Sequence, residues 1–143
     1  MGVRVRLRVK LGDRAVELIA LVSSGAESPI PLLVLTKEIG RELGIYPPRN
    51  ADTYEAKHAS RNYTSAVFVC RDLAEIELVN GEEVLTRVRA YVGVDPTLDE
   101  SIVTDALIDE LGIVVIKYRD GLWRHSRDPS NKVRTSAAVR TQY

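Results

Sequence analysis

Hydroxyl side chains gather in the short turn Ser23-Ser24-Gly25-Ala26, which ends an apolar segment. A serine hydroxyl becomes a nucleophile only when a neighbouring base takes its proton. His58 is the one base that we expect to approach Ser23, and it lies on a predicted hairpin where a histidine is normally solvated. Glu27 would supply a carboxylate, but it should already be leaving the turn, so we interpret it as a surface or dimer-contact charge. The residues alone therefore favour no serine-hydrolase site.

The composition of the 143-residue chain narrows the possible classes of protein. Its 20 Lys and Arg residues balance 20 Asp and Glu residues, so no strong field for nucleic acid or a membrane is expected. Two histidines and a single cysteine, Cys70, argue against a zinc site, and we predict no metal and no cofactor. No signal peptide or membrane-spanning run is evident, which predicts a cytoplasmic protein without a membrane partner. The 28% of charged residues beside one glutamine is typical of thermophiles.

Alternating apolar residues and turn signals predict a chain made mainly of β-strands. Val3 to Leu11 alternates apolar and basic residues, as a half-buried strand does. Thr36 is a typical helix N-cap and Gly44 a typical C-terminal stop, which predicts a short helix between them. Asn80-Gly81 between two apolar runs predicts a hairpin. The other expected elements are strands at 15–22, 74–79, 84–94, 113–116 (buried) and 122–124, a two-stranded hairpin within 53–69, and a second helix at about 104–111.

Four basic residues share one face of the first expected strand. They are Arg4, Arg6, Arg8 and Lys10. Such a row can contact phosphates, but it is more often the solvated face of an edge strand, where charge blocks unwanted strand pairing. We adopt the edge-strand interpretation, so nucleic acid is not expected as a partner.

An internal repeat relates the two expected helices. Leu35 to Ile45 aligns with Val103 to Ile113 at an offset of 68 positions (103 − 35), with Thr, Glu, Leu, Gly and Ile identical. The same offset carries the Gly12-Asp13 turn onto Asn80-Gly81. A turn and a helix that recur at one offset predict a pseudo-twofold domain. The alternative is that two unrelated amphipathic helices both end in Leu-Gly-Ile.

The order of these motifs resembles that in the lobe of a retroviral-type aspartic protease. Ala20 to Glu27 is similar to the family's motif of apolar residues followed by Asp, Thr or Ser, Gly and Ala. Leu35 to Ile45 resembles its first helix, and Ile102 to Thr104 stands where the family has two apolar residues and a glycine. Asp120 to Arg124 resembles part of its closing strand. The resemblance extends over roughly residues 3 to 124 and is greatest for small archaeal and bacterial retropepsin-like proteins.

The resemblance implies a site that lacks its central residue. In the family, two chains each supply an aspartate, and the two carboxylates share one proton so that one acts as base and the other as acid. Ser23 stands at the position of that aspartate, and its hydroxyl cannot accept a proton from water. Ser24 and Gly25 stand where the family braces the pair. Thr104 replaces a glycine, and the expected hairpin tip, 59–62, lacks the glycine that a closing flap usually needs.

The predicted fold is an all-β domain with two short helices over residues 1–124, followed by a polar basic tail at 125–143. The resemblance implies the single-lobe acid-protease form, a closed β-barrel with an internal pseudo-twofold that pairs as a homodimer. Ser23, Ser24 and Gly25 then mark the catalytic position. The residues expected to contact a ligand are Ala26, Glu27, His58, Ala59, Ser60, Arg61 and Thr104.

The predicted function is a catalytically inactive, retropepsin-like module that binds an extended peptide or protein segment in the dimer groove. One alternative is a genuine aspartic endopeptidase whose aspartate has been substituted at Ser23 or is supplied by a partner chain. Another is a nucleic-acid-associated structural dimer that uses the basic strand and the tail.

Overall fold

The first strand, β1 (Arg4–Leu11), forms because apolar and charged residues alternate along it. In the computed structural model, which describes residues 2–58 and 63–137, Val5, Leu7 and Val9 of this strand are buried. Gly12 adopts a φ of 59°, a left-handed conformation that suits glycine, and turns the chain into β2 (Arg14–Val22). The two strands pair antiparallel over their whole length. This hairpin agrees with the sequence prediction.

The described chain is mostly β with two short helices, as the sequence predicted. Neither helix has the length and apolar character needed to cross a membrane, within the described residues. The elements after β2 are β3 (Leu32–Leu35), α1 (Lys37–Leu43), β4 (Ala51–His58), β5 (Tyr63–Cys70), β6 (Ala74–Asn80), β7 (Glu83–Val94), β8 (Ile102–Val103), α2 (Asp105–Leu111), β9 (Ile113–Lys117), β10 (Leu122–His125) and β11 (Arg134–Thr135).

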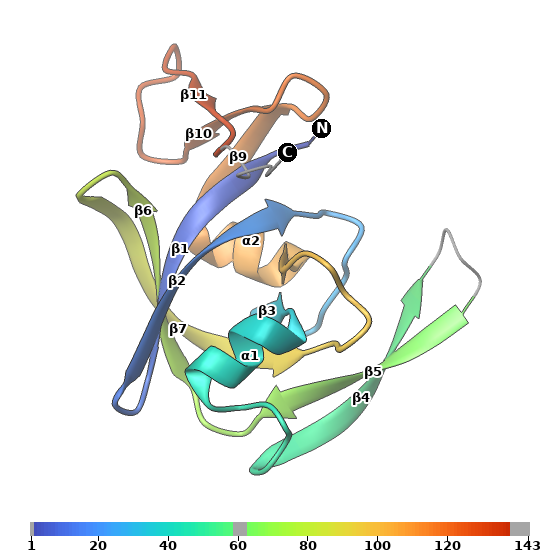
Figure 1. Ribbon diagram of the computed structural model, residues 1–143. Coiled ribbons are helices and arrows are strands. Elements are labelled where there is room, and N and C mark those ends of the chain that lie inside the picture. The colour runs from blue at the N-terminus through green and yellow to red at the C-terminus, as the bar shows by residue number, and fades with distance from the viewer. Residues whose placement is uncertain (1, 59–62, 138–143) are drawn as a thin grey trace, which may run out of the picture.

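The main sheet has the strand order β3-β8-β2-β1-β6-β7-β5-β4, and β3 also pairs with β7. Two of the pairings are parallel, β2 with β8 and β3 with β7, and the others are antiparallel. The β4–β5 hairpin extends away from the rest of the molecule in Figure 1. A smaller sheet has the order β11-β10-β9. The chain thus brings the ends of β2 and β7 next to strands that are distant in the sequence.

The two helices have matching lengths and matching glycines at their C-terminal ends. Both α1 and α2 span seven residues, and their starts, Lys37 and Asp105, are 68 positions apart (105 − 37). Gly44 and Gly112 end them with φ values of 83° and 76°. The helices themselves agree with the sequence prediction.

The core lies between the sheet and the two helices. Leu43 of α1 and Leu107 and Leu111 of α2 are buried against apolar residues of the strands. Full burial of a leucine side chain contributes roughly 1.5–3 kcal/mol relative to an exposed one. Tertiary burial therefore stabilises these helices, because two turns of isolated helix are not stable in water.

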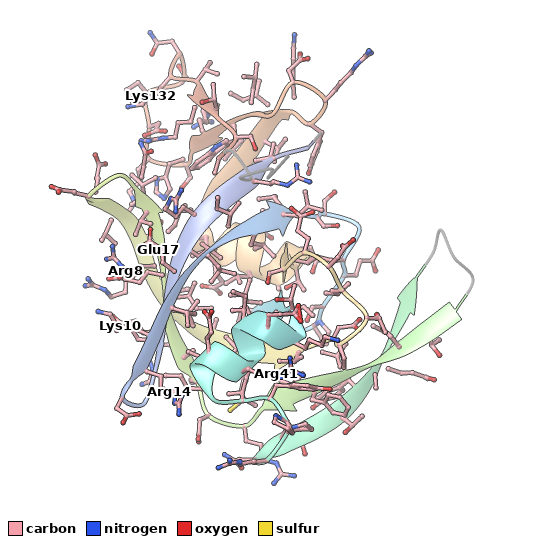
Figure 2. All side chains as sticks on the ribbon, viewed as in Figure 1. Arg8, Lys10, Arg14, Glu17, Arg41 and Lys132 are labelled. Carbon is pink, nitrogen blue, oxygen red and sulfur yellow. The ribbon has the colours of Figure 1, made fainter. Side chains whose placement is uncertain are left out.

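The edge-strand interpretation of the basic row was wrong, because β1 lies between β2 and β6. Arg8 contacts Glu77 of β6 at 3.2 Å and Glu17 of β2 at 3.9 Å. Glu77 is 1% exposed, and its pKa is lowered mainly by the hydrogen bonds from Arg87. Figure 2 shows Arg8, Lys10 and Glu17 together at the outer side of these strands. Carboxylates on the two neighbouring strands, and not solvent alone, therefore balance the positive charge of the basic residues on β1.

Two local predictions also need correction. The turn between β6 and β7 is formed by Gly81 and Glu82, because Asn80 is still paired with Glu83 at the end of the ladder. The strand β9 was expected to be buried, but only Ile113 is, and Ile116 is 42% exposed. Burial falls along this strand from Ile113 to Lys117, and β9 is an edge strand of the small sheet, where it pairs only with β10.

The segment after residue 124, predicted as a tail, forms structure as far as residue 137. Arg134 of β11 makes a 2.7 Å ion pair with Asp128 and lies over the ring of the buried Trp123. The pKa of Asp128 is well below its usual value, chiefly because of the hydrogen bonds from Arg134. His125 is buried with its Nε2 atom 2.6 Å from the Thr86 hydroxyl. This segment packs onto the β domain, while the division of the chain at residue 124 stays a prediction.

Candidate functional site

The loop that begins at Ser23 continues directly from β2. Val22, the last residue of β2, pairs with Val103 of β8. The Ser23 backbone N–H donates to the Val103 carbonyl at 3.2 Å, and the Ala26 N–H donates to the Ser23 carbonyl at 3.1 Å. A long apolar strand therefore positions the first residue of the loop, and a tight turn of small residues follows.

Asp105 fixes the far side of this loop. Its backbone N–H donates to the Ala26 carbonyl at 3.0 Å. Its Oδ1 atom accepts hydrogen bonds from the N–H groups of Ser28, at 2.8 Å, and Ala106, at 2.7 Å. Sequence reasoning missed this residue, although an aspartate in the first turn of a helix commonly accepts backbone N–H bonds. The carboxylate lies beside the loop, but it is already engaged by backbone donors.

The residues at the middle of the loop face solvent. Ser24, Gly25 and Glu27 are exposed, and Ser23 and Ala26 are half-buried. No atom lies within 4 Å of the position that a Cβ atom on Gly25 would take. The loop thus presents hydroxyl and backbone groups on an open side of the protomer.

Thr104 lies behind the loop rather than on its open side. Its side chain is 3% exposed, and its hydroxyl donates to the Leu32 carbonyl at 2.7 Å and accepts from the Leu32 N–H at 3.3 Å. These bonds join the start of α2 to β3, so the threonine hydroxyl is occupied within the protein.

The predicted hairpin residues are only partly described. His58 ends β4, where its backbone pairs with Tyr63 of β5. Ala59, Ser60 and Arg61 lie outside the described residues. In Figure 1 the last described part of β4 and the first described part of β5 lie on the same side of the molecule as the loop after β2. The described strands therefore agree with a hairpin in this region.

A buried carboxylate that the sequence analysis did not single out lies at the end of β7. Asp95 is 2% exposed and accepts a 2.6 Å hydrogen bond from the Ser65 hydroxyl. It also accepts bonds from the Thr97 N–H and hydroxyl at 3.0 and 2.7 Å. Its own N–H donates to the Leu35 carbonyl at 3.2 Å. The Asp95-Pro96 pair was a usable signal, because an aspartate side chain commonly accepts from the backbone N–H two residues on in such a turn.

The chemistry available at the loop is that of hydrogen bonding. The described residues contain no group of three or more His, Cys, Asp or Glu side chains suited to a metal ion. Two surface hollows, of about 510 and 480 Å³, are lined by other parts of the chain, the first by Arg4, Ile39 and Glu100 among others, the second by Arg14 and Cys70 among others. Neither of them includes a residue of the 23–28 loop. Within a single chain, the loop is thus an exposed surface and not part of either hollow.

Comparisons with known proteins show a similarity to solved structures. No family model and no curated protein matches the sequence. The crystal structure of the retroviral protease-like domain of Ddi1 from Leishmania major aligns with 92% of this chain and 98% of that chain. The identity is 13% and the TM-score is 0.47. This similarity assigns no function to any residue of the present chain.

Proposed function

We propose that the chain is a retropepsin-like module built from a duplicated unit. The pairing scheme supports this, because exchanging β1 with β6, β2 with β7 and β3 with β8 reproduces the same ring of six paired strands. The offset of 68 positions carries the pair Arg8–Glu77 of the antiparallel β1–β6 ladder onto Ile76–Val9, which is also a pair of that ladder, as expected where two copies meet at a local twofold. The matching helices that follow β3 and β8 belong to the same scheme.

The second part of the proposal is that two copies pair with their Ser23 loops facing one another. One protomer offers only an open ledge, on which Ser24 and Gly25 are exposed. A symmetric pair would convert two ledges into one groove, and an isologous dimer is the commonest way in which two identical chains associate. The β4–β5 hairpins would stand at the sides of this groove.

The third part is that the groove binds an extended peptide without cleaving it. The observation that carries this part is that Ser23 leads the fixed, exposed loop with a hydroxyl in place of a carboxylate. A hydroxyl can hydrogen-bond water but does not accept its proton, and general acid–base catalysis typically contributes on the order of 10²–10⁴-fold. Asp105 uses its Oδ1 atom to accept from the Ser28 and Ala106 N–H groups, and we assign it this structural role and not that of the missing base.

The pairing of Arg8 with Glu17 and Glu77 gives no support to the nucleic-acid alternative. The endopeptidase alternative makes a different prediction at one position. If the frame of an aspartic protease is intact, Ser23→Asp should restore two carboxylates that share a proton.

The experiment compares the unmodified chain, Ser23→Asp and Ser23→Ala with a pool of decapeptides, followed by mass spectrometry at several pH values. We expect no cleavage by the unmodified chain or by Ser23→Ala, and retention of a subset of peptides by both. Cleavage by Ser23→Asp with an acidic optimum would identify a disabled enzyme, because the shared proton sets that optimum. Cleavage by the unmodified chain that survives Ser23→Ala would contradict the proposal. Absence of any retained peptide would contradict its binding part.

A further inference from the structure

The β4–β5 hairpin is joined to the main sheet by a short ladder. Over the described residues, β4 and β5 pair with each other along eight positions, from Ala51–Cys70 to His58–Tyr63. The ladder between β5 and β7 contains only the pairs Phe68–Val94 and Val69–Gly93. The hairpin therefore leaves the sheet close to Phe68, and its orientation depends on what holds it at that point.

Gly93 allows β5 to approach β7 closely at this junction. A Cβ atom on Gly93 would lie 3.2 Å from the Phe68 carbonyl and 3.2 Å from side-chain atoms of Val67 and Val69. These distances are shorter than ordinary van der Waals contacts. The junction is thus tightly packed on one side of the ladder.

A buried hydrogen bond lies just beyond the ladder. Ser65 is three residues past Phe68 towards the end of the hairpin, and its hydroxyl donates to Asp95 Oδ2 at 2.6 Å. Both side chains are buried, with exposures of 8% and 2%. A hydrogen bond to a carboxylate is roughly twice as strong as one between neutral groups.

Asp95 is itself fixed to the body of the protein. Its N–H donates to Leu35 at the end of β3, and its Oδ1 atom accepts from Thr97. The carboxylate therefore joins the hairpin to the sheet and to the loop that leads to β8. Ser65 contacts the one oxygen and Thr97 the other, which allows the two connections to be removed separately.

We propose that Ser65 and Asp95 form a pivot that sets the orientation of the β4–β5 hairpin relative to the Ser23 loop. Beyond Ser65 the described hairpin has the pairs Lys57–Thr64 and His58–Tyr63, which lie outside the ladder with β7. A change at Ser65 therefore affects the direction of this outer part of the hairpin. Its importance for binding rests on the function proposed above. The pivot itself requires no ligand and can be tested alone.

The test is amide hydrogen exchange, measured by mass spectrometry on the full chain without peptide. Ser65→Ala removes the hydroxyl that reaches Oδ2, and Thr97→Val removes the hydroxyl that reaches Oδ1. We expect Ser65→Ala to raise exchange in β4 and β5 by roughly 10- to 100-fold, the range for loss of a hydrogen bond to a charged group. Exchange in β1 and β2 should stay unchanged. Thr97→Val should leave exchange in the hairpin within about twofold of the unmodified chain, since the link to Ser65 is kept.

Urea unfolding of the same variants gives their global free energy of unfolding, so it separates a local change at the hairpin from a general loss of stability. Hairpin exchange within twofold of the unmodified chain in Ser65→Ala would overturn the proposal. An equal rise in β1 and β2, or an effect of Thr97→Val equal to that of Ser65→Ala, would also overturn it. Failure of decapeptide binding would contradict the proposed function and leave this result intact, because the exchange measurement contains no peptide.

Discussion

The loops that follow β2 and β7 begin alike and then diverge. Ser23 and Asp95 are each the first residue after their strand, and each donates its N–H at 3.2 Å to the carbonyl two residues before a helix. Those carbonyls belong to Val103 and Leu35, which are 68 positions apart (103 − 35). The first loop then opens towards solvent at Gly25, whereas the second is folded inward on a buried carboxylate.

Under the proposed function, the same backbone hydrogen bond starts two loops with different roles. The loop at Asp95 has a charged acceptor that is satisfied by Ser65 and Thr97, so the loop is an internal anchor. The loop at Ser23 leaves Ser24 and Gly25 exposed, which is what the proposed binding surface requires. Under the proposed duplication, the carboxylate is present in the half that anchors and absent from the half that presents the site.

The largest expected change in the free energy of unfolding distinguishes the loop at Asp95 from the loop at Ser23. Asp95→Ala leaves the buried Ser65 and Thr97 donors without their acceptor and should lower the free energy of unfolding by about 2–4 kcal/mol. Ser23→Ala should change it by no more than about 0.5 kcal/mol, because the residue is half-buried on an open loop. Urea unfolding at neutral pH measures both. Equal losses for the two variants would remove the contrast between anchor and surface.

The sequence predicted the longer strands, both helices and the first loop, because these depend on local patterns. It did not predict the short strands β3, β8 and β11, which are defined by pairing with other parts of the chain. Alternation defines β1, and Thr36 and Gly44 define the bounds of α1. The role of Asp95 was not predicted, since it depends on Ser65, which is 30 positions away and reaches it only through the sheet. The interpretation of the basic row as an edge strand was wrong for the same reason, because strand order depends on segments that are distant in the sequence. Nothing within Arg4 to Leu11 indicates that β6 pairs on its second side.

The next largest expected loss of stability comes from Asp105, which holds the loop after β2. Asp105→Ala removes the acceptor of the Ser28 and Ala106 N–H groups and should lower the free energy of unfolding by about 1–2 kcal/mol. Exchange of the Ser28 amide should rise with it. Asp105→Asn is the matched control, since its carbonyl oxygen can still accept both bonds, and it should cost less. A larger loss for Asp105→Asn than for Asp105→Ala would argue against the assigned hydrogen bonds.

A smaller effect distinguishes the two helix starts. The Thr36 hydroxyl accepts from the Ile39 N–H and caps α1, whereas the Thr104 hydroxyl is bonded to Leu32 and leaves α2 without a side-chain cap. Thr36→Val and Thr104→Val should each cost about 1 kcal/mol. The amide that exchanges faster should be Ile39 in the first variant and Leu32 in the second. Faster exchange at the start of α2 in Thr104→Val, with Leu32 unchanged, would contradict the assignment.

The last effect appears as the pH falls and comes from a carboxylate outside both loops. The pKa of Glu77 is lowered in the folded chain, chiefly by hydrogen bonds from Arg87. Its contribution to stability is therefore complete above the unfolded pKa, near about 4, and is lost as the pH falls through the lower folded value. Glu77→Gln should flatten the acid part of the stability curve, whereas Glu82→Gln, on the exposed β6–β7 turn, should not. Identical acid profiles for the unmodified chain and Glu77→Gln would contradict this.

The central claim, that two copies place their Ser23 loops face to face, can be tested most directly by cross-linking. In a Cys70→Ala background, Ser24→Cys puts one thiol on each exposed loop, and Glu82→Cys puts one on the exposed turn between β6 and β7. We predict that mild oxidation links Ser24→Cys into a disulfide dimer far faster than Glu82→Cys, and that light scattering finds the unmodified chain dimeric at tens of micromolar. A monomer at that concentration, with equal and slow cross-linking of both variants, would contradict the account.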